Sequence, residues 1–382
     1  MIVSKTLTHR ISLYLLLIST LLYFSQGVLI AEETYGPVFL FVIFGISFIY
    51  LFKVLQSKEL FKGLSKVWFL FLIVNVFFYI FTAHSNIERN TSILKIVLLN
   101  FLPFFPFLYF SKINLLSRNV LILFFVLALS IFIVKFRISL FELQYSRNKD
   151  WVVDNTIYLF IGLLPFAFLF KRKSLIFIFL IIIWYFMVLS SKRAAIVSGL
   201  FAILLFIYQI IYVSKDKYKL ASIIVAVVLG LFITYLAYHF YIENEYLVSR
   251  IELMLEGDSS NRDILVVNHF NRWYNSNNLI VYLFGFGYNS SQMFQANVAH
   301  NDWIDMLGSF GIFGLILYIT LWYYMIRELF VGDWNKNKKI IMILFLGLSF
   351  IASLFFRWYN SPFPFMNFII LPYLITTKEK SI

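Results

Sequence analysis

Long runs of apolar residues, divided by short polar segments, make up most of this sequence. Most runs hold about 17–21 residues, the length that an α-helix needs to cross the hydrocarbon core of a bilayer. Strands of a membrane barrel would instead alternate apolar and polar residues over about ten positions. The pattern therefore predicts about twelve transmembrane helices. Their expected ranges are 11–31, 36–54, 67–83, 93–110, 119–134, 156–170, 174–190, 194–213, 220–239, 303–325, 340–356 and 364–376.

The composition agrees with a membrane location. Hydrophobic residues make up 61% of the 382-residue chain and charged residues only 13%, whereas a soluble domain carries about 25% charged residues. Because lipid cannot hydrogen-bond to the backbone, a chain inside it forms helices or closed barrels. The continuous apolar runs favour helices, so we expect an all-α polytopic membrane protein.

Basic residues indicate which side of the membrane each loop faces. Cytoplasmic loops of membrane proteins carry an excess of Lys and Arg. If the N-terminus lies in the cytoplasm, the most basic loops are cytoplasmic as well, and the rule is satisfied. These loops are 53–66, 112–118, 171–173, 215–219 and 327–339.

Two longer loops then face outward. One covers about 135–155, and the other, about 240–302, is long enough to form a small cap on the membrane face. The expected organisation is helices one to nine in 1–239, a partly helical extracytoplasmic loop over 240–302, and helices ten to twelve in 303–382.

The sequence lacks the residues that several functions require. The chain has no Cys, so it has neither disulfides nor thiolate metal ligands. Its five His are scattered without the paired spacing of a metal site. The predicted helices hold almost no ionisable residues, which argues against an ion-coupled transporter, because such proteins keep charged residues near the bilayer midplane.

The long outer loop contains a candidate anion-binding site. Ser260 and Asp263 have the spacing of a capping box before an apolar-periodic stretch, so a helix is expected to begin here. Arg262 then lies in the first turn, beside backbone N–H groups that attract anions. A cation at this end of a helix carries a small free-energy penalty, which favours a functional role for Arg262 over a surface one.

Four further arginines on the outward side are candidates for the site. Arg193 lies in a short turn between two predicted helices, where it either anchors the helix end or holds a lipid-linked phosphate. Arg250 and Arg272 share the long loop; a simple surface position is one interpretation of both, and substrate binding is the other. Arg147 lies in the earlier outer loop.

A histidine follows at the end of the long loop. His300 precedes Asn301 and Asp302, which open the next predicted helix. A lone His is more often structural than catalytic, but this one lies at the predicted boundary between water and lipid. There it can take a proton near neutral pH, so His300 is a candidate base.

Glycines flank this histidine. Gly285-Phe286-Gly287 before it predicts a tight turn, and Gly308, Gly311 and Gly314 after it lie three apart, which allows close helix packing. Taken together, the outer residues offer cations for a phosphate and a base for a hydroxyl. They predict an outward-facing site for an anionic, lipid-linked substrate.

At these residues the sequence resembles the O-antigen polymerase and O-antigen ligase superfamily. The main resemblance is the segment from His300 to Gly314, which is similar to the family's His-Asn, an apolar or aromatic position, Leu or Glu, and then Gly-x-x-Gly entering a helix. The predicted topology, with its long loop between the ninth and tenth helices, also fits. Three shorter segments resemble family motifs: Ser260-Asn261-Arg262 (Ser-Gly-Arg), Gly285-Phe286-Gly287 (Gly-x-Gly) and Ser191-Lys192-Arg193 (Ser-Arg, with a Lys inserted).

The resemblance implies a glycosyltransferase at the outer face of the bacterial inner membrane, with a glycan on undecaprenyl diphosphate as its donor. Arg262 and Arg193 would bind the diphosphate, and His300 would deprotonate or orient the acceptor hydroxyl. No nucleotide, metal ion or cofactor is expected, because the lipid diphosphate is the leaving group. Further candidates for substrate binding are Arg147, Asn301, Asp302, Arg250 and Arg272.

The polymerase branch is favoured, because Asn-Asp after the His resembles that branch. A polymerase transfers the growing chain from its lipid carrier to the non-reducing end of a new lipid-linked repeat unit, whereas a ligase transfers the polymer to lipid A–core. A transporter of lipid-linked sugars and another type of membrane acyl- or glycosyltransferase stay open as alternatives. Expected partners are the lipid-linked oligosaccharide, the bilayer and a chain-length regulator, and no nucleic acid.

Overall fold

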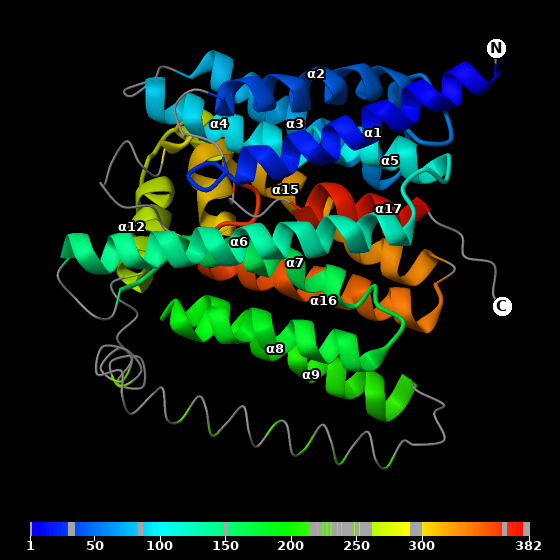
Figure 1. The fold of residues 1–382 in the computed structure, drawn as a ribbon. Coiled ribbons are helices and arrows are strands. Elements are labelled where there is room, and N and C mark those ends of the chain that lie inside the picture. The colour runs from blue at the N-terminus through cyan, green and yellow to red at the C-terminus, as the bar shows by residue number, and fades with distance from the viewer. Residues whose placement is uncertain are drawn as a thin grey trace.

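Helices form the regular elements in the described part of the chain (Figure 1). The computed structural model describes residues 2–29, 35–82, 87–147, 152–213, 262–290, 300–332, 334–360 and 365–376, together with single positions within 220–252. The elements are α1 (Ile2–Phe24), α2 (Gly36–Leu55), α3 (Leu64–Phe81), α4 (Ile87–Phe101), α5 (Phe104–Lys112), α6 (Arg118–Arg147), η1 (Asn155–Ile157), α7 (Tyr158–Ala167), α8 (Lys173–Leu189), α9 (Arg193–Tyr208), η2 (Gln209–Val213), α12 (Arg262–Tyr274), α13 (Leu279–Phe284), α15 (Asp302–Val331), α16 (Lys336–Phe355), η3 (Met366–Ile370) and α17 (Leu371–Thr376).

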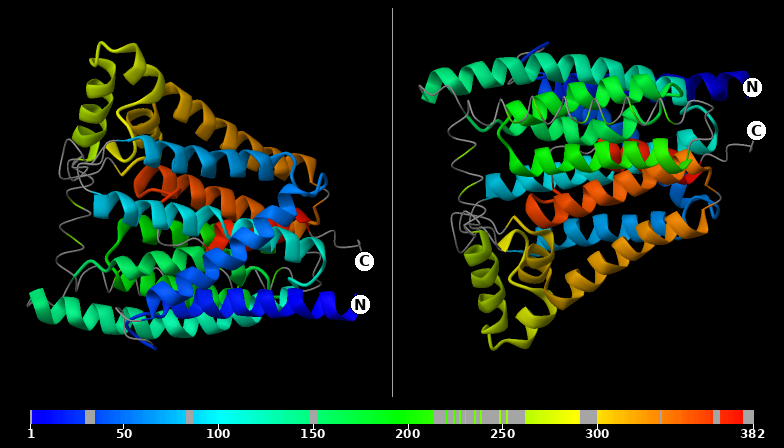
Figure 2. Two further views of the ribbon diagram at one scale, coloured as in Figure 1. Left: turned by 90° about the horizontal axis from the view of Figure 1, so that it is seen from above. Right: turned by 90° about the horizontal axis from the view of Figure 1, so that it is seen from below.

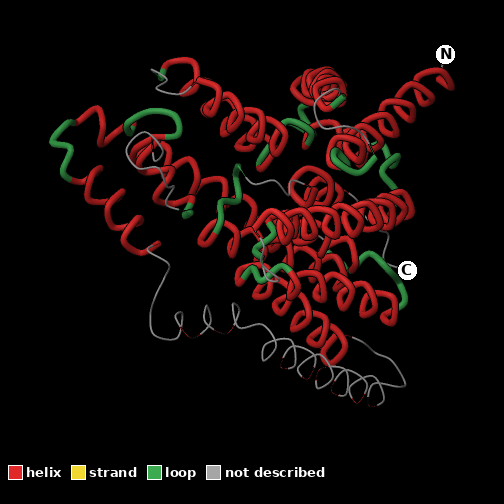
Figure 3. Tube along the Cα trace, turned by 60° about the vertical axis from the view of Figure 1, so that its left-hand side comes forward, coloured by secondary structure: helices red, strands yellow, loops and turns green. Residues whose placement is uncertain are grey.

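The long helices lie side by side and run in roughly the same direction (Figure 2). Among the described residues, eight helical spans are long and apolar enough to cross a membrane, and three shorter apolar helices accompany them. Short turns join many of the neighbouring helices (Figure 3). The chain is therefore an all-helical, multi-pass membrane protein. The count of twelve spans stays a prediction, and most of 220–239 lies outside the described residues.

The end of α6 differs from the sequence-based expectation. The sequence predicts an outer loop over 135–155. The first part of this prediction is wrong, because α6 continues as one helix to Arg147. Lys135 does not end the helix, since its Nζ donates to the carbonyl oxygens of Phe24 (3.1 Å) and Gln26 (2.8 Å). These carbonyls lie at the C-terminal end of α1, where a cation is favourable.

The first helix also lies earlier in the chain than the expected range 11–31. It begins at Ile2 and ends at Phe24. Ser25 follows, and its hydroxyl donates to the carbonyl oxygen of Leu22 (2.9 Å). Gly27 then adopts a φ of 83°, a conformation that ends helices and that glycine adopts without strain. The helix thus ends before the apolar run does.

Aromatic side chains fix the segment that follows α16. Trp358 is fully buried and packs edge-on against Trp68 of α3, with ring centroids 6.0 Å apart. Its indole N–H donates to the side-chain oxygen of Asn367 (3.0 Å). Trp68 in turn donates to the carbonyl oxygen of Phe101 (3.0 Å). These contacts fix the segment after α16 in the core, although it lies outside the long helices.

Helix α15 is interrupted at Gly311, whose φ is 66° and ψ is −159°. A Cβ at this position would lie 2.5 Å from the backbone of Leu283, so α13 packs directly on the interruption. The backbone N–H groups of Phe286 and Gly287 donate to the carbonyls of Gly308 (2.8 Å) and Ser309 (3.1 Å). The chain bends at Phe286 and Gly287, within the tight turn expected over 285–287, and a hydrogen-bonded turn follows at 288–289. The bend satisfies the carbonyls that the broken helix releases.

Candidate active site

The N-terminus of α15 holds His300 in place. Asn301 caps the helix, because its side-chain oxygen accepts from the backbone N–H groups of Trp303 (3.0 Å) and Ile304 (3.2 Å). His300 lies just before this cap with a φ of 50°, and its side chain is half-buried. The oxygen of Asn301, a predicted substrate ligand, is therefore engaged with the protein's own backbone.

Asp302 joins α15 to the segment after α16. Its side chain is fully buried. One carboxylate oxygen accepts from the hydroxyl of Tyr318 (2.9 Å) and from the backbone N–H groups of Trp358 (2.7 Å) and Tyr359 (3.3 Å). Asp302 therefore supports the site from within the protein instead of facing solvent.

A buried ion pair lies one turn further along α15. A terminal guanidinium nitrogen of Arg357 lies 3.7 Å from the Asp305 carboxylate, and the two side chains are 10% and 1% exposed. The hydroxyl of Tyr359 donates to the same carboxylate (2.6 Å). Arg357 has a φ of 84°, which is costly for a residue with a Cβ and persists only where the surroundings impose it. The fold thus holds this arginine in one position.

Sequence reasoning missed Arg357. A signal was present, because Arg357 is the single charged residue between the apolar runs 340–356 and 364–376. Its partner Asp305 lies far away in the chain, inside a predicted transmembrane helix. Only the packing of the segment after α16 against α15 shows that the two charges meet.

Arg262 is the first residue of α12, in the first turn as predicted. A terminal guanidinium nitrogen donates to the carbonyl oxygen of Phe355 (3.1 Å), the last residue of α16. This bond places Arg262 next to the segment that carries Arg357. Ser260, the predicted N-cap, and Asn261, which belongs to the segment that resembles a family motif, lie outside the described residues.

The turn between α8 and α9 supplies a third cation. Lys192 lies immediately before α9, and its Nζ lies 5.4 Å from the centre of the Tyr158 ring. Tyr158 stacks on Phe356, with ring centroids 5.0 Å apart. Through Tyr158, Lys192 lies near Phe356 at the end of α16. Arg262 binds the same end of the helix, and Arg357 follows it. Arg193, the neighbour of Lys192, is the first residue of α9 and is half-buried.

These charges act together on His300. Burial lowers the pKa of His300, and the nearby charges of Arg262, Arg357 and Lys192 lower it further, to about 4, against a smaller opposing effect of Asp305. The imidazole is therefore neutral near neutral pH. An anion that neutralises these cations would raise the pKa of His300 again. The arrangement can bind an anion and present a base beside it.

The other predicted arginines take different places. Arg147 is exposed as the last residue of α6, and Arg272 is exposed in the last turn of α12, with its guanidinium 6.0 Å from the centre of the Phe286 ring. Arg250 lies outside the described residues. Of the predicted arginines, Arg262 is the one whose charge lowers the pKa of His300. In the turn before α9, Lys192 has this effect, although the sequence analysis singled out its neighbour Arg193.

No cluster of three or more His, Cys, Asp or Glu side chains that could hold a metal ion occurs in the part of the chain that the structure describes. No protein-family model matches this chain, and no curated protein matches it either. The function must therefore be argued from the site.

Proposed function

We propose that this chain is a membrane glycosyltransferase that polymerises lipid-linked repeat units. Its donor is a glycan on undecaprenyl diphosphate, and its acceptor is the non-reducing end of another lipid-linked repeat unit. The observation that carries the proposal is the group of three cations, Arg262, Lys192 and Arg357, around the neutral imidazole of His300. The sequence resemblance to O-antigen polymerases supports the same assignment.

The position of the group suits a lipid diphosphate. One residue separates His300 from the start of α15, a candidate membrane span, and one residue separates Arg357 from the end of α16, another candidate span. Side chains at the ends of such spans lie at the level of the lipid headgroups. In the proposed topology of twelve spans with a cytoplasmic N-terminus, this end of the bundle faces outward at a bacterial inner membrane.

The proposed reaction is a single glycosyl transfer. The acceptor hydroxyl oxygen attacks the anomeric carbon of the donor, and the bond between that carbon and the diphosphate oxygen breaks. The electron pair stays on the diphosphate, where Arg262 and Lys192 stabilise the charge. The hydroxyl proton passes to His300. Because cationic side chains stabilise the leaving group, the proposal calls for neither a metal ion nor a cofactor.

The bound diphosphate also prepares the base. In the free site the cations keep the pKa of His300 at about 4, where an imidazole is a weak base. When the diphosphate neutralises them, the pKa rises towards the range in which general bases work best. His300 would then become basic when the donor is in place. Arg357 stays anchored by Asp305 and holds the positive potential close to the imidazole.

A deletion strain tests the overall reaction and separates polymerase from ligase. A polymerase deletion should leave surface glycans capped with a single repeat unit. Polymer that accumulates on its lipid carrier would instead assign the ligase reaction to the same site. Normal glycan in the deletion strain would reject both reactions.

Purified protein with a lipid-linked repeat unit tests the site itself. Arg262→Ala and His300→Ala should each lower the transfer rate by at least about 100-fold, in line with the loss of an oxyanion-stabilising group or a general base. Arg262→Lys should restore activity in part, because it keeps the charge and loses the two-point contact. The matched control is Arg89→Ala, an exposed arginine in the first turn of α4. Equal activity in all four variants would overturn the assignment.

A further inference from the structure

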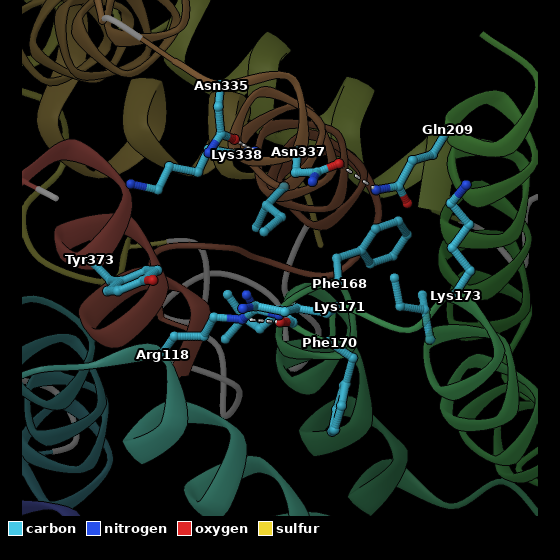
Figure 4. Close-up of a pocket in the computed structure, with 13 residues that line it drawn as sticks. Arg118, Phe168, Phe170, Lys171, Lys173, Gln209, Asn335, Asn337, Lys338 and Tyr373 are labelled. Atoms are coloured by element: carbon cyan, nitrogen blue, oxygen red, sulfur yellow. Dashed lines mark hydrogen bonds between the residues drawn. The ribbon is translucent and has the colours of Figure 1, made fainter. Parts of the chain in front are cut away.

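A second cationic site lies at the opposite end of the bundle. A cavity of about 330 Å³ opens between the ends of α6, α7, α8, α9, α16 and α17 (Figure 4). Helix α16 connects the two sites, since its first turn lines this cavity and the residue after its last turn precedes Arg357. Twenty helical residues place the sites about 30 Å apart. In the proposed topology this end is cytoplasmic.

The cavity collects positive charge. Four cations line it, namely Arg118, Lys171, Lys173 and Lys338, and none of the described residues that line it is Asp or Glu. Lys338 is only 6% exposed, and its Nζ lies 5.8 Å from the centre of the Tyr373 ring. Four cationic side chains around one cavity produce a positive potential that attracts anions. The cavity therefore has the electrostatics of an anion site.

Hydrogen bonds hold the walls of the cavity in shape. The side-chain oxygen of Asn335 accepts from the backbone N–H of Lys338 (2.9 Å) and caps α16, so the positive end of this helix faces the cavity. The amide of Gln209 donates to the side chain of Asn337 (3.0 Å). Arg118 donates through Nε to the carbonyl oxygen of Leu169, which fixes the plane of its guanidinium. Arg118 thus needs little rearrangement to bind an anion.

We propose that this cavity binds a phosphate group, supplied by an anionic phospholipid of the cytoplasmic leaflet. Phosphate accepts hydrogen bonds from every side, which matches a lining rich in cationic and amide donors. The lining also includes apolar side chains, among them Phe168, Phe170 and Ile341, which are suitable contacts for the glycerol and the start of the acyl chains. Basic pockets between transmembrane helices on the cytoplasmic side are suited to anionic headgroups. Binding of a phosphate group here does not depend on the glycosyl transfer proposed at the other end of the bundle.

Native mass spectrometry of the purified protein tests the proposal with two lipids of equal chain length, phosphatidylglycerol and phosphatidylcholine. Wild type should retain phosphatidylglycerol with about tenfold preference, and Lys171→Gln/Lys173→Gln should lose that preference. The matched control is Lys336→Gln/Lys339→Gln, which removes the same charge from exposed positions beside the cavity that do not line it. Equal retention by the two double variants would overturn the proposal, because a generic basic surface would then explain the binding.

A phosphate titration and a further variant, Lys338→Met, decide between the other possible results. A thermal-shift titration with inorganic phosphate separates the sources: stabilisation by phosphate but not by phosphatidylglycerol, lost in the cavity variant, would support the phosphate site and overturn its lipid source. Lys338→Met removes the buried charge, and it should weaken phosphatidylglycerol retention at least as much as the double variant. If the lipid-free cavity variant melts below its control, the Lys338→Met variant and the phosphate titration decide the question.

Discussion

At the scale of single residues, the structure separates side chains that face the proposed substrate from those that hold the site together. The sequence analysis predicts a catalytic role for His300 and substrate binding for Asn301 and Asp302. In the structure, Asn301 caps α15 and Asp302 is fully buried under three hydrogen bonds. His300 is partly exposed, and the charges of Arg262, Arg357 and Lys192 act on it. The role of Asp302 depends on long-range packing, which a motif does not contain.

Substitution of Asn301 tests its role as a helix cap. Asn301→Ser should retain activity and stability, because serine is nearly as good an N-cap as asparagine. Asn301→Ala should lower the free energy of unfolding by about 1 kcal/mol and weaken activity through the displaced His300. Activity and thermal unfolding of the purified variants provide the measurement. A serine variant as inactive as the alanine variant would indicate direct substrate contact by the amide instead.

The pKa of His300 predicts a pH dependence of diphosphate binding. Burial and the nearby cations lower this pKa to about 4 in the free protein, and a bound diphosphate raises it. Binding then takes up a proton between the two pKa values, so the affinity should increase as the pH falls from 7 towards 5. Titration of an undecaprenyl diphosphate against the protein at several pH values measures this effect.

His300→Gln is the control for that titration, because glutamine does not titrate. The difference between wild type and this variant removes the contribution of the ligand's own ionisation. The same pH dependence in both proteins would show that no proton goes to His300 on binding.

At the scale of elements, the site depends on where helices stop. The apolar runs predict most helices, but not their ends, because an end depends on partners elsewhere in the fold. Lys135 continues inside α6 because the C-terminus of α1 binds it. The interruption of α15 at Gly311 was visible only as a glycine suited to close packing. That α13 covers it, and that 285–287 takes up the released carbonyls, required the three-dimensional arrangement.

Gly311 provides a prediction at this scale. Gly311→Ala forces a side chain into a positive φ and places a Cβ 2.5 Å from the backbone of Leu283. It should lower the free energy of unfolding by about 2–4 kcal/mol. Gly308→Ala is a matched control on the same helix, since the nearest atom to its Cβ would be 3.7 Å away. Thermal unfolding in detergent compares the two, and equal stability would contradict the described packing.

At the scale of the whole molecule, hydropathy predicts the class of protein and charge predicts its orientation. The all-helical, multi-pass fold could be predicted because lipid leaves few alternatives for so apolar a chain. The complete site could not be predicted, since Arg357, Lys192 and Arg262 come from three separate segments. The two cationic sites lie at opposite ends of the bundle, so the proposed orientation gives each one a different side of the membrane.

The orientation can be tested cleanly because the chain has no Cys. Asn275 is exposed in the turn between α12 and α13, and Lys58 is exposed between α2 and α3. The substitutions Asn275→Cys and Lys58→Cys therefore place one accessible thiol at each end of the bundle. In cells with an intact inner membrane, a maleimide that cannot cross membranes should label position 275 and leave position 58 unlabelled. Both positions should react after the membrane is broken. The reverse pattern would place the His300 site in the cytoplasm and exclude the proposed topology.

The central claim is that cations around His300 bind a lipid diphosphate, and the dissociation constant of undecaprenyl diphosphate tests it most directly. Loss of one charge-assisted contact of about 1.5–3 kcal/mol should make Arg262→Ala bind at least about tenfold more weakly than wild type. His300→Ala should bind about as tightly as wild type while failing to transfer glycan. Binding by Arg262→Ala that equals wild type would contradict the account.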